Sequence, residues 1–156
     1  MCLDEKRHEQ LSAFQERIGY HFDNVNWLNE ALTHSSKRTE GPNGMQWNER
    51  LEFLGDAALN FVVTDYLFNK YDRAQEGTLT ELRKSMVDES ALCDVGKRMG
   101  IREVLDIGNS PRMGGGVSNF MVGDATEAIL GAIYRDGGGV DAVRQFIHRW
   151  FVNGVR

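Results

Sequence analysis

The chain has 156 residues, 41% hydrophobic and 26% charged, which suits one globular domain with its own core. Its two cysteines exclude a disulfide framework, and charged or amide residues interrupt every long apolar stretch, which excludes a membrane span. With 18 basic and 23 acidic residues the net charge is −5, which excludes a strongly basic protein. The charged N-terminus has no apolar core typical of a signal peptide, so we expect a soluble, cytoplasmic protein with no membrane partner.

Helical periodicity recurs along the chain, and no segment shows the sustained alternation of a strand. Asp23 or Asn24 can cap the second predicted helix, Asp88 can cap the fifth, and Gly100 suits the position just after the fifth. We therefore predict an all-α fold with helices at residues 5–18, 25–34, 46–70, 78–85, 88–99, 117–136 and 139–152.

The helix predicted at 46–70 carries an unusual pair of carboxylates. From Leu51 to Val63 it is apolar except for Glu52, Asp56 and Asn60, which recur every fourth residue and so form one polar stripe. A single acidic pair is usually a solvated helix face. Here the flanking residues are those of a buried helix, where an unpartnered carboxylate is costly. The stripe therefore indicates a cation-binding site.

A second carboxylate pair lies about seventy residues later, in the apolar segment 120–134. Asp124 and Glu127 are three residues apart and share one helix face. If the two pairs face each other, four negative charges converge, and two divalent cations would balance them. Because the site offers only oxygen ligands, it favours Mg²⁺ over zinc, with Mn²⁺ as a substitute.

Glycines inside these two segments predict a close approach of helices. Gly55 costs about 1 kcal/mol relative to alanine in a helix interior, which is understandable where another backbone or a metal-bound water must come near. Gly123 and Gly131 can serve the facing helix in the same way.

Two loops flank the carboxylate segments. Residues 37–47 begin with Lys37 and Arg38, and residues 108–119 contain three consecutive glycines and Arg112. They are either ordinary surface loops or flexible loops that touch a ligand at the site.

Four blocks of the sequence resemble ribonuclease III, the endonuclease of double-stranded RNA. The segment NERLEFLGDAALN (48–60) is similar to the signature of that family. Three further blocks occur in the family's order, namely ALTHSS (31–36), EGTLTELR (76–83) and GDATEAILGAIYRDGG (123–138). The resemblance implies the helical fold of a ribonuclease III endonuclease domain, with residues 1–156 as one nuclease domain and no double-stranded-RNA-binding domain in this chain.

The resemblance also implies an activity and its residues. Glu52, Asp56, Asp124 and Glu127 would hold Mg²⁺, with Asp56 and Glu127 as catalytic residues and Glu49 in support. The enzyme would hydrolyse double-stranded RNA with two metals, in RNA processing, leaving 5′-phosphate and 3′-hydroxyl ends. The alternative is a non-catalytic RNA-binding scaffold of the same fold in a ribonucleoprotein. A di-iron bundle would need two Glu-x-x-His motifs, which the carboxylate segments lack.

Further roles follow from the resemblance or from charge. In the family, the phenylalanine that matches Phe53 inserts into a partner subunit, which implies a homodimer; a core aromatic is the alternative. Basic residues are candidates for phosphate contacts. We interpret His34 as a structural histidine rather than a ligand, with an RNA-facing position as the alternative. The candidate phosphate contacts are Lys37, Arg38, Arg83, Lys84, Lys97, Arg98 and Arg112.

Overall fold

The computed structural model describes residues 3–39, 46–109 and 116–154. Within these ranges the fold is all-α, as predicted, and the β contacts are limited to one isolated parallel bridge between Thr33 and Asp106. The α-helices are α1 (Glu5–Ile18), α2 (Val25–Ala31), α3 (Glu49–Lys70), α4 (Glu76–Val87), α5 (Glu89–Met99), α6 (Ile101–Val104), α7 (Asn119–Ile133) and α8 (Gly139–Ile147). The shorter elements are a 3-10 helix, η1 (Ser35–Thr39), and two π-helical turns, η3 (Tyr134–Gly138) and η4 (His148–Val152).

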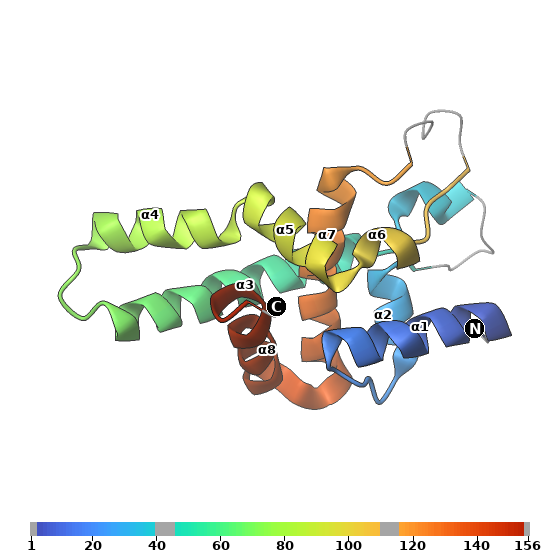
Figure 1. The fold of residues 1–156 in the computed structure, drawn as a ribbon, viewed down its shortest axis with the longest axis horizontal. Helices are drawn as coiled ribbons and strands as arrows, with labels where there is room; N and C mark the ends of the chain where they lie inside the picture. The colour runs from blue at the N-terminus through green and yellow to red at the C-terminus, as the bar shows by residue number, and fades with distance from the viewer. Residues whose placement is uncertain (1–2, 40–45, 110–115, 155–156) are drawn as a thin grey trace.

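Helix α7 runs through the middle of the molecule, and α3 crosses it (Figure 1). From Val122 to Ile133 every residue of α7 is buried except Asp124, which is half-buried. This segment is built from small and apolar residues, so all its faces can pack, and α2, α3, α5 and α8 all contact it. The core of the fold is therefore centred on the helix that carries the second carboxylate pair.

Glycines bring the backbones of α3 and α7 together where the two helices cross. A Cβ atom on Gly55 would collide with the carbonyl oxygen of Glu127, and one on Gly131 would collide with the carbonyl oxygen of Leu51. The close approach predicted for Gly55 and Gly131 is thus confirmed. Gly123 does not share this role, because a Cβ there would make ordinary contact with Leu92, at 3.6 Å.

The second half of α3 and the antiparallel α4 form an arm that projects away from the other helices (Figure 1). No residue of α4 is fully buried, and its apolar residues Leu79 and Leu82 are half-covered. On α3, Phe61 and Phe68 remain exposed. None of the helices in the described ranges has the length and apolar content to cross a membrane.

Several predicted helix bounds were wrong. The second helix ends at Ala31 rather than residue 34, because Thr33 turns into the bridge with Asp106 and η1 follows. The long helix begins at Glu49 rather than 46, and the next one covers Glu76–Val87 rather than 78–85. The 3-10 helix η1 and the single-turn helix α6 were not predicted, because they are too short to show periodicity.

The end of the chain also differs from the prediction. Helix α7 ends at Ile133, and the π-helical turn η3 follows it. In η3 Gly137 adopts a φ of 105° and kinks the chain before α8.

The predicted caps are confirmed: Asn24 accepts a hydrogen bond from the backbone of Asn26, and Asp88 accepts one from that of Ala91. Gly100 follows α5 with a left-handed φ of 79°.

Candidate metal centre

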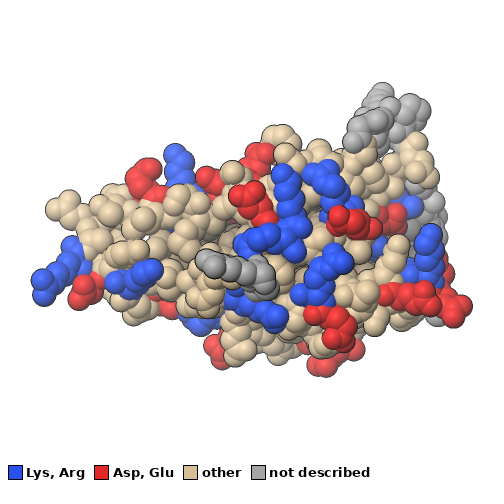
Figure 2. All heavy atoms as spheres, in the orientation of Figure 1, with Lys and Arg blue, Asp and Glu red and all other residues tan. Residues whose placement is uncertain are grey.

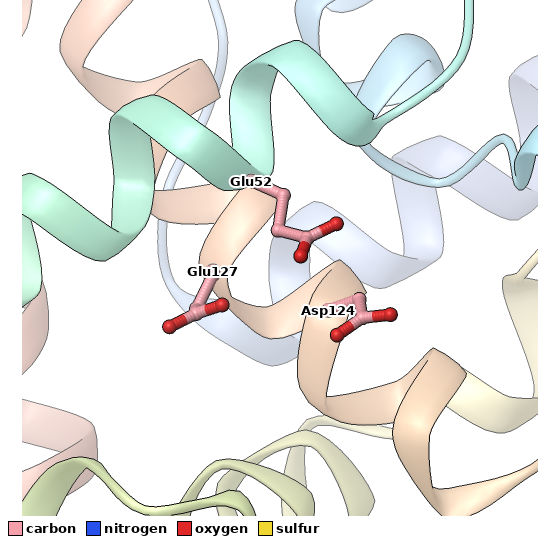
Figure 3. Close-up of side chains that lie close together, drawn as sticks. All are labelled: Glu52, Asp124 and Glu127. Carbon is pink, nitrogen blue, oxygen red and sulfur yellow. The ribbon is translucent and has the colours of Figure 1, made fainter.

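Three of the four predicted ligands converge where α3 and α7 cross. Glu52 projects from α3, and Asp124 and Glu127 project from successive turns of α7 toward the same space (Figure 3). One carboxylate oxygen of each lies within 4.8 Å of the other two. The geometry follows from the glycine crossing, since the backbone of Glu127 lies against Gly55, one turn beyond Glu52.

Burial and mutual repulsion shift the pKa values of these carboxyls upward. Burial is the main cause for Glu127, followed by the neighbouring Asp56 carboxylate and its hydrogen bond and then by the charges of Glu52 and Asp124; together they raise its pKa to about 8. Burial, with the charges of Asp124, Glu49 and Asp56, raises the pKa of Glu52 to about 7. The cluster therefore binds protons tightly near neutral pH, and a divalent cation would compete for the same oxygens.

Asp124 differs from the other two in having a basic neighbour. Burial raises its pKa, the electrostatic interaction with His34 partly opposes that shift, and the charge of Glu89 adds to it. The sequence favours a structural role for His34 over a ligand role, with an RNA-facing position as the alternative. The structure places it close to a candidate ligand, which no helical spacing could reveal because His34 lies outside both carboxylate helices.

Asp56 lies beside the three clustered carboxylates and is more exposed than they are. Its Oδ1 accepts a hydrogen bond of 2.9 Å from the side-chain amide of Asn60, and its carboxylate contacts that of Glu127. The polar stripe predicted on α3 is thus present, with Asn60 orienting Asp56 at the edge of the cluster.

Glu49 lies one turn before Glu52 and is exposed. Its carboxylate accepts a hydrogen bond of 2.9 Å from the indole of Trp47, and its charge contributes to the raised pKa of Glu52. The neighbouring Arg50 acts instead on Glu30, where its charge opposes the increase in pKa that burial causes. Glu49 is therefore placed to influence the cluster electrostatically without joining it.

Phe53 is 82% exposed, so the alternative of a core aromatic was wrong for the isolated subunit. It borders a surface pocket of about 640 Å³, whose apolar lining includes Trp27, Leu51 and Leu54. The rest of the lining is charged, and an exposed aromatic side chain beside a pocket with an apolar part and a charged rim is typical of an interaction surface.

Most described candidates for phosphate contact already have partners within the chain. Lys37 Nζ lies 3.5 Å from a carboxylate oxygen of Asp106, and Arg83 donates to the hydroxyl of Thr64 at 3.1 Å. Arg98 donates to the carbonyl of Trp150 and lies over its ring. Lys84 and Lys97 are exposed, whereas Arg112 and the side chain of Arg38 lie outside the described residues.

The face of the molecule drawn in Figure 2 carries several basic side chains. Lys and Arg side chains gather over the middle of this face, around α5 and α8, with acidic residues between and beside them (Figure 2). The mixed charges give no continuous basic groove on this face.

Comparison with known proteins identifies the kind of domain. Residues 24–155 match a family model described as ribonuclease-III-like. Proteins called ribonuclease 3 from Bdellovibrio bacteriovorus and Actinobacillus pleuropneumoniae are each 38% identical, over 141 and 143 residues. These matches cover 90% and 91% of this chain but 60% and 61% of the relatives, so the chain spans about three fifths of the length of the curated relatives it matches.

The fold has a matching solved structure. The nuclease domain of a ribonuclease III from Campylobacter jejuni, described for structural flexibility in a region involved in dimer formation, superposes with a TM-score of 0.78 and 33% identity. The match covers 88% of this chain and 93% of that domain.

Proposed function

The chain belongs to the ribonuclease III family, and we propose that it is an Mg²⁺-dependent endonuclease of double-stranded RNA. The observation that carries the proposal is the convergence of Glu52, Asp124 and Glu127 at the α3–α7 crossing. Without a cation, the electrostatic repulsion among these clustered carboxylates would destabilise the fold and nothing would compensate for it.

The donor set suits Mg²⁺ or Mn²⁺, because Glu52, Asp124, Glu127 and the adjacent Asp56 present only carboxylate oxygens. A bound divalent cation supplies an activated water and stabilises negative charge on the phosphate. The protein itself orients the ligands: Asn60 holds Asp56, and the packed backbones of α3 and α7 fix Glu52 relative to Glu127. Two cations would match the four negative charges, and we expect products with 5′-phosphate and 3′-hydroxyl ends.

We also propose that the protein acts as a two-fold homodimer. Phe53 and the partly apolar pocket beside it lie on one surface, as a self-complementary interface requires. The dimer formation described for the Campylobacter jejuni domain supports the proposal. Two copies would present one carboxylate cluster to each strand of a duplex, whose shape and phosphates rather than base edges would be recognised.

Cleavage of a long perfect RNA duplex at low salt tests the function. Low salt is needed because a chain with a net charge of −5 gains little from counterion release. We expect shortening to 5′-phosphorylated fragments with Mg²⁺ and none with EDTA. An intact duplex at high concentrations of folded, dimeric protein would contradict the proposal and favour the non-catalytic RNA-binding scaffold.

A further inference from the structure

His34 sits in a segment that is rigidly attached to the start of α3. The backbone N–H of His34 donates to the carbonyl of Asp106 at 2.9 Å, and that of Asn48 donates to the carbonyl of Thr33 at 2.9 Å. The carbonyl of Asn48 in turn accepts a 2.8 Å hydrogen bond from the backbone N–H of Glu52. Two backbone hydrogen bonds therefore connect the residue next to His34 with a member of the carboxylate cluster.

The imidazole is oriented by three hydrogen bonds that involve Ser36. The backbone N–H of Ser36 donates to Nδ1 at 3.1 Å, and the Ser36 hydroxyl lies 2.8 Å from the same nitrogen. The hydroxyl is itself held by the backbone N–H of Gly108, at 2.8 Å. Because a backbone N–H can only donate, Nδ1 is an acceptor and the ring proton is on Nε2.

The Nε2–H group is left available for another molecule. Among the described residues none forms a hydrogen bond with Nε2, and the side chain is only half-buried. The hydrogen bonds through Asn48 bring the segment of His34 to the turn of α3 that carries Glu52, and the charge of His34 also acts on Asp124 of α7. A fixed donor there can bind a phosphate oxygen of the substrate, which the carboxylates alone would repel.

We propose that His34 is a substrate-positioning residue whose Nε2–H donates a hydrogen bond to an RNA backbone phosphate beside the carboxylate cluster. The inference rests on the proposed function, because it assumes a duplex RNA substrate. It assigns His34 to the substrate rather than to the metal: Nδ1 is used by Ser36, and Nε2 carries a proton in both the neutral and the protonated ring.

Two amide substitutions at His34 test the Nε2–H donor separately from the hydrogen bonds that Nδ1 makes with Ser36. In His34→Asn the side-chain oxygen can still accept from Ser36, as Nδ1 does, but no donor reaches the position of Nε2. In His34→Gln the longer side chain can place an amide N–H near that position. Thermal unfolding checks that both variants are folded, and His21→Asn, an exposed histidine paired with Glu16, is the matched control.

The readouts are duplex affinity with Ca²⁺ in place of Mg²⁺, KM and kcat for cleavage, and Mn²⁺ affinity without RNA. We expect His34→Asn to weaken duplex affinity and raise KM about tenfold. Mn²⁺ affinity should be unchanged, and both His34→Gln and His21→Asn should stay within about threefold of the unmodified protein.

Each contrary result has a distinct meaning. Wild-type affinity and KM in His34→Asn, or an equal loss in both amide variants, would overturn the inference while leaving the nuclease in place. A fall in Mn²⁺ affinity as large as the fall in duplex affinity would also overturn it, by showing that His34 acts through Asp124. If the unmodified protein neither bound nor cleaved duplex RNA, the proposed function and this inference would fall together.

Discussion

The two halves of α3 lie in opposite environments. The first half crosses α7 at Gly55, where backbones touch and carboxylates with raised pKa values are enclosed. The second half pairs with α4 in the projecting arm, where Phe61 and Phe68 are 58% and 69% exposed. Near its first end α3 thus holds the half-buried Glu52 against the buried Glu127 of α7, whereas its second half exposes apolar groups, and both features depart from what solvation alone favours. The two regions therefore test different parts of the proposals, the cation site at the crossing and the role of the exposed aromatic side chains.

Glu127→Gln is the sharpest test of the crossing, because it removes one charge with little change in volume. We expect duplex cleavage to fall by about 10³-fold, as for loss of a preorganised catalytic group. The metal-free fold should be at least as stable at pH 9, where the enclosed charge is destabilising. Cleavage assays and thermal unfolding check both parts, and Glu81→Gln on exposed α4 is the matched charge change. Equal cleavage by Glu127→Gln and the unmodified protein would remove Glu127 from the mechanism.

Gly55→Ala tests whether the close crossing itself is required. A methyl group there would meet the carbonyl oxygen of Glu127, and the helices must separate to admit it. We expect a loss of about 1–3 kcal/mol in the free energy of unfolding, measured with urea, together with weaker Mn²⁺ binding. Gly77→Ala is the control in the arm, since nothing lies within 4 Å of a Cβ at that position and alanine is the better helix former. Similar effects of the two substitutions on the free energy of unfolding would show that helix propensity, rather than close packing, determines the effect of the substitution at Gly55.

Phe53→Ala tests the exposed aromatic nearest the crossing. We expect the dimer dissociation constant to rise about thirtyfold, the effect of losing a hot-spot side chain. The stability of the monomer should hardly change, because the side chain is 82% exposed. Sedimentation equilibrium measures the first quantity and thermal unfolding of the dilute protein the second. Phe68→Ala provides the comparison in the arm, and a larger effect there would move the centre of the interface outward along α3.

The pH dependence of the metal-free protein tests the enclosed charge directly. Glu127 and Glu52 have folded pKa values of about 8 and about 7, against an ordinary value of 4.5. The folded state therefore binds these protons more tightly than the unfolded state does. The free energy of unfolding should fall as pH rises from about 4.5 to about 8 and then level off.

Metal affinity should change in the opposite direction over the same range. Because cations compete with protons for these oxygens, Mn²⁺ affinity should rise by more than about tenfold between pH 6 and pH 8, as measured by calorimetry. For the measurement of stability against pH, the control is Glu127→Gln, in which the free energy of unfolding should depend much less on pH. A pH-independent stability from 5 to 9 would show that the carboxyls are not enclosed as the structure has them.

Local sequence patterns were enough to predict most of the helices. The 3.6-residue period identified the long helices, and the capping roles of Asn24, Asp88 and Gly100 needed only their neighbours in the chain. Helix bounds failed where tertiary contacts intervened, as when the bridge between Thr33 and Asp106 ended α2 early. Short elements such as α6 were missed because one helical turn has no period to detect.

The sequence by itself determined that each of two apolar helices carries a carboxylate pair on one face, because helical geometry relates residues three or four apart. Only the tertiary structure decided that Glu52 meets Asp124 and Glu127 while Asp56 lies at the edge. It also decided that Phe53 faces outward and that His34 stands beside Asp124. The physical reason is that the distance between side chains on different helices depends on how closely the helices cross. Here the contact of Gly55 with the Glu127 backbone sets that distance, and it joins segments some seventy residues apart.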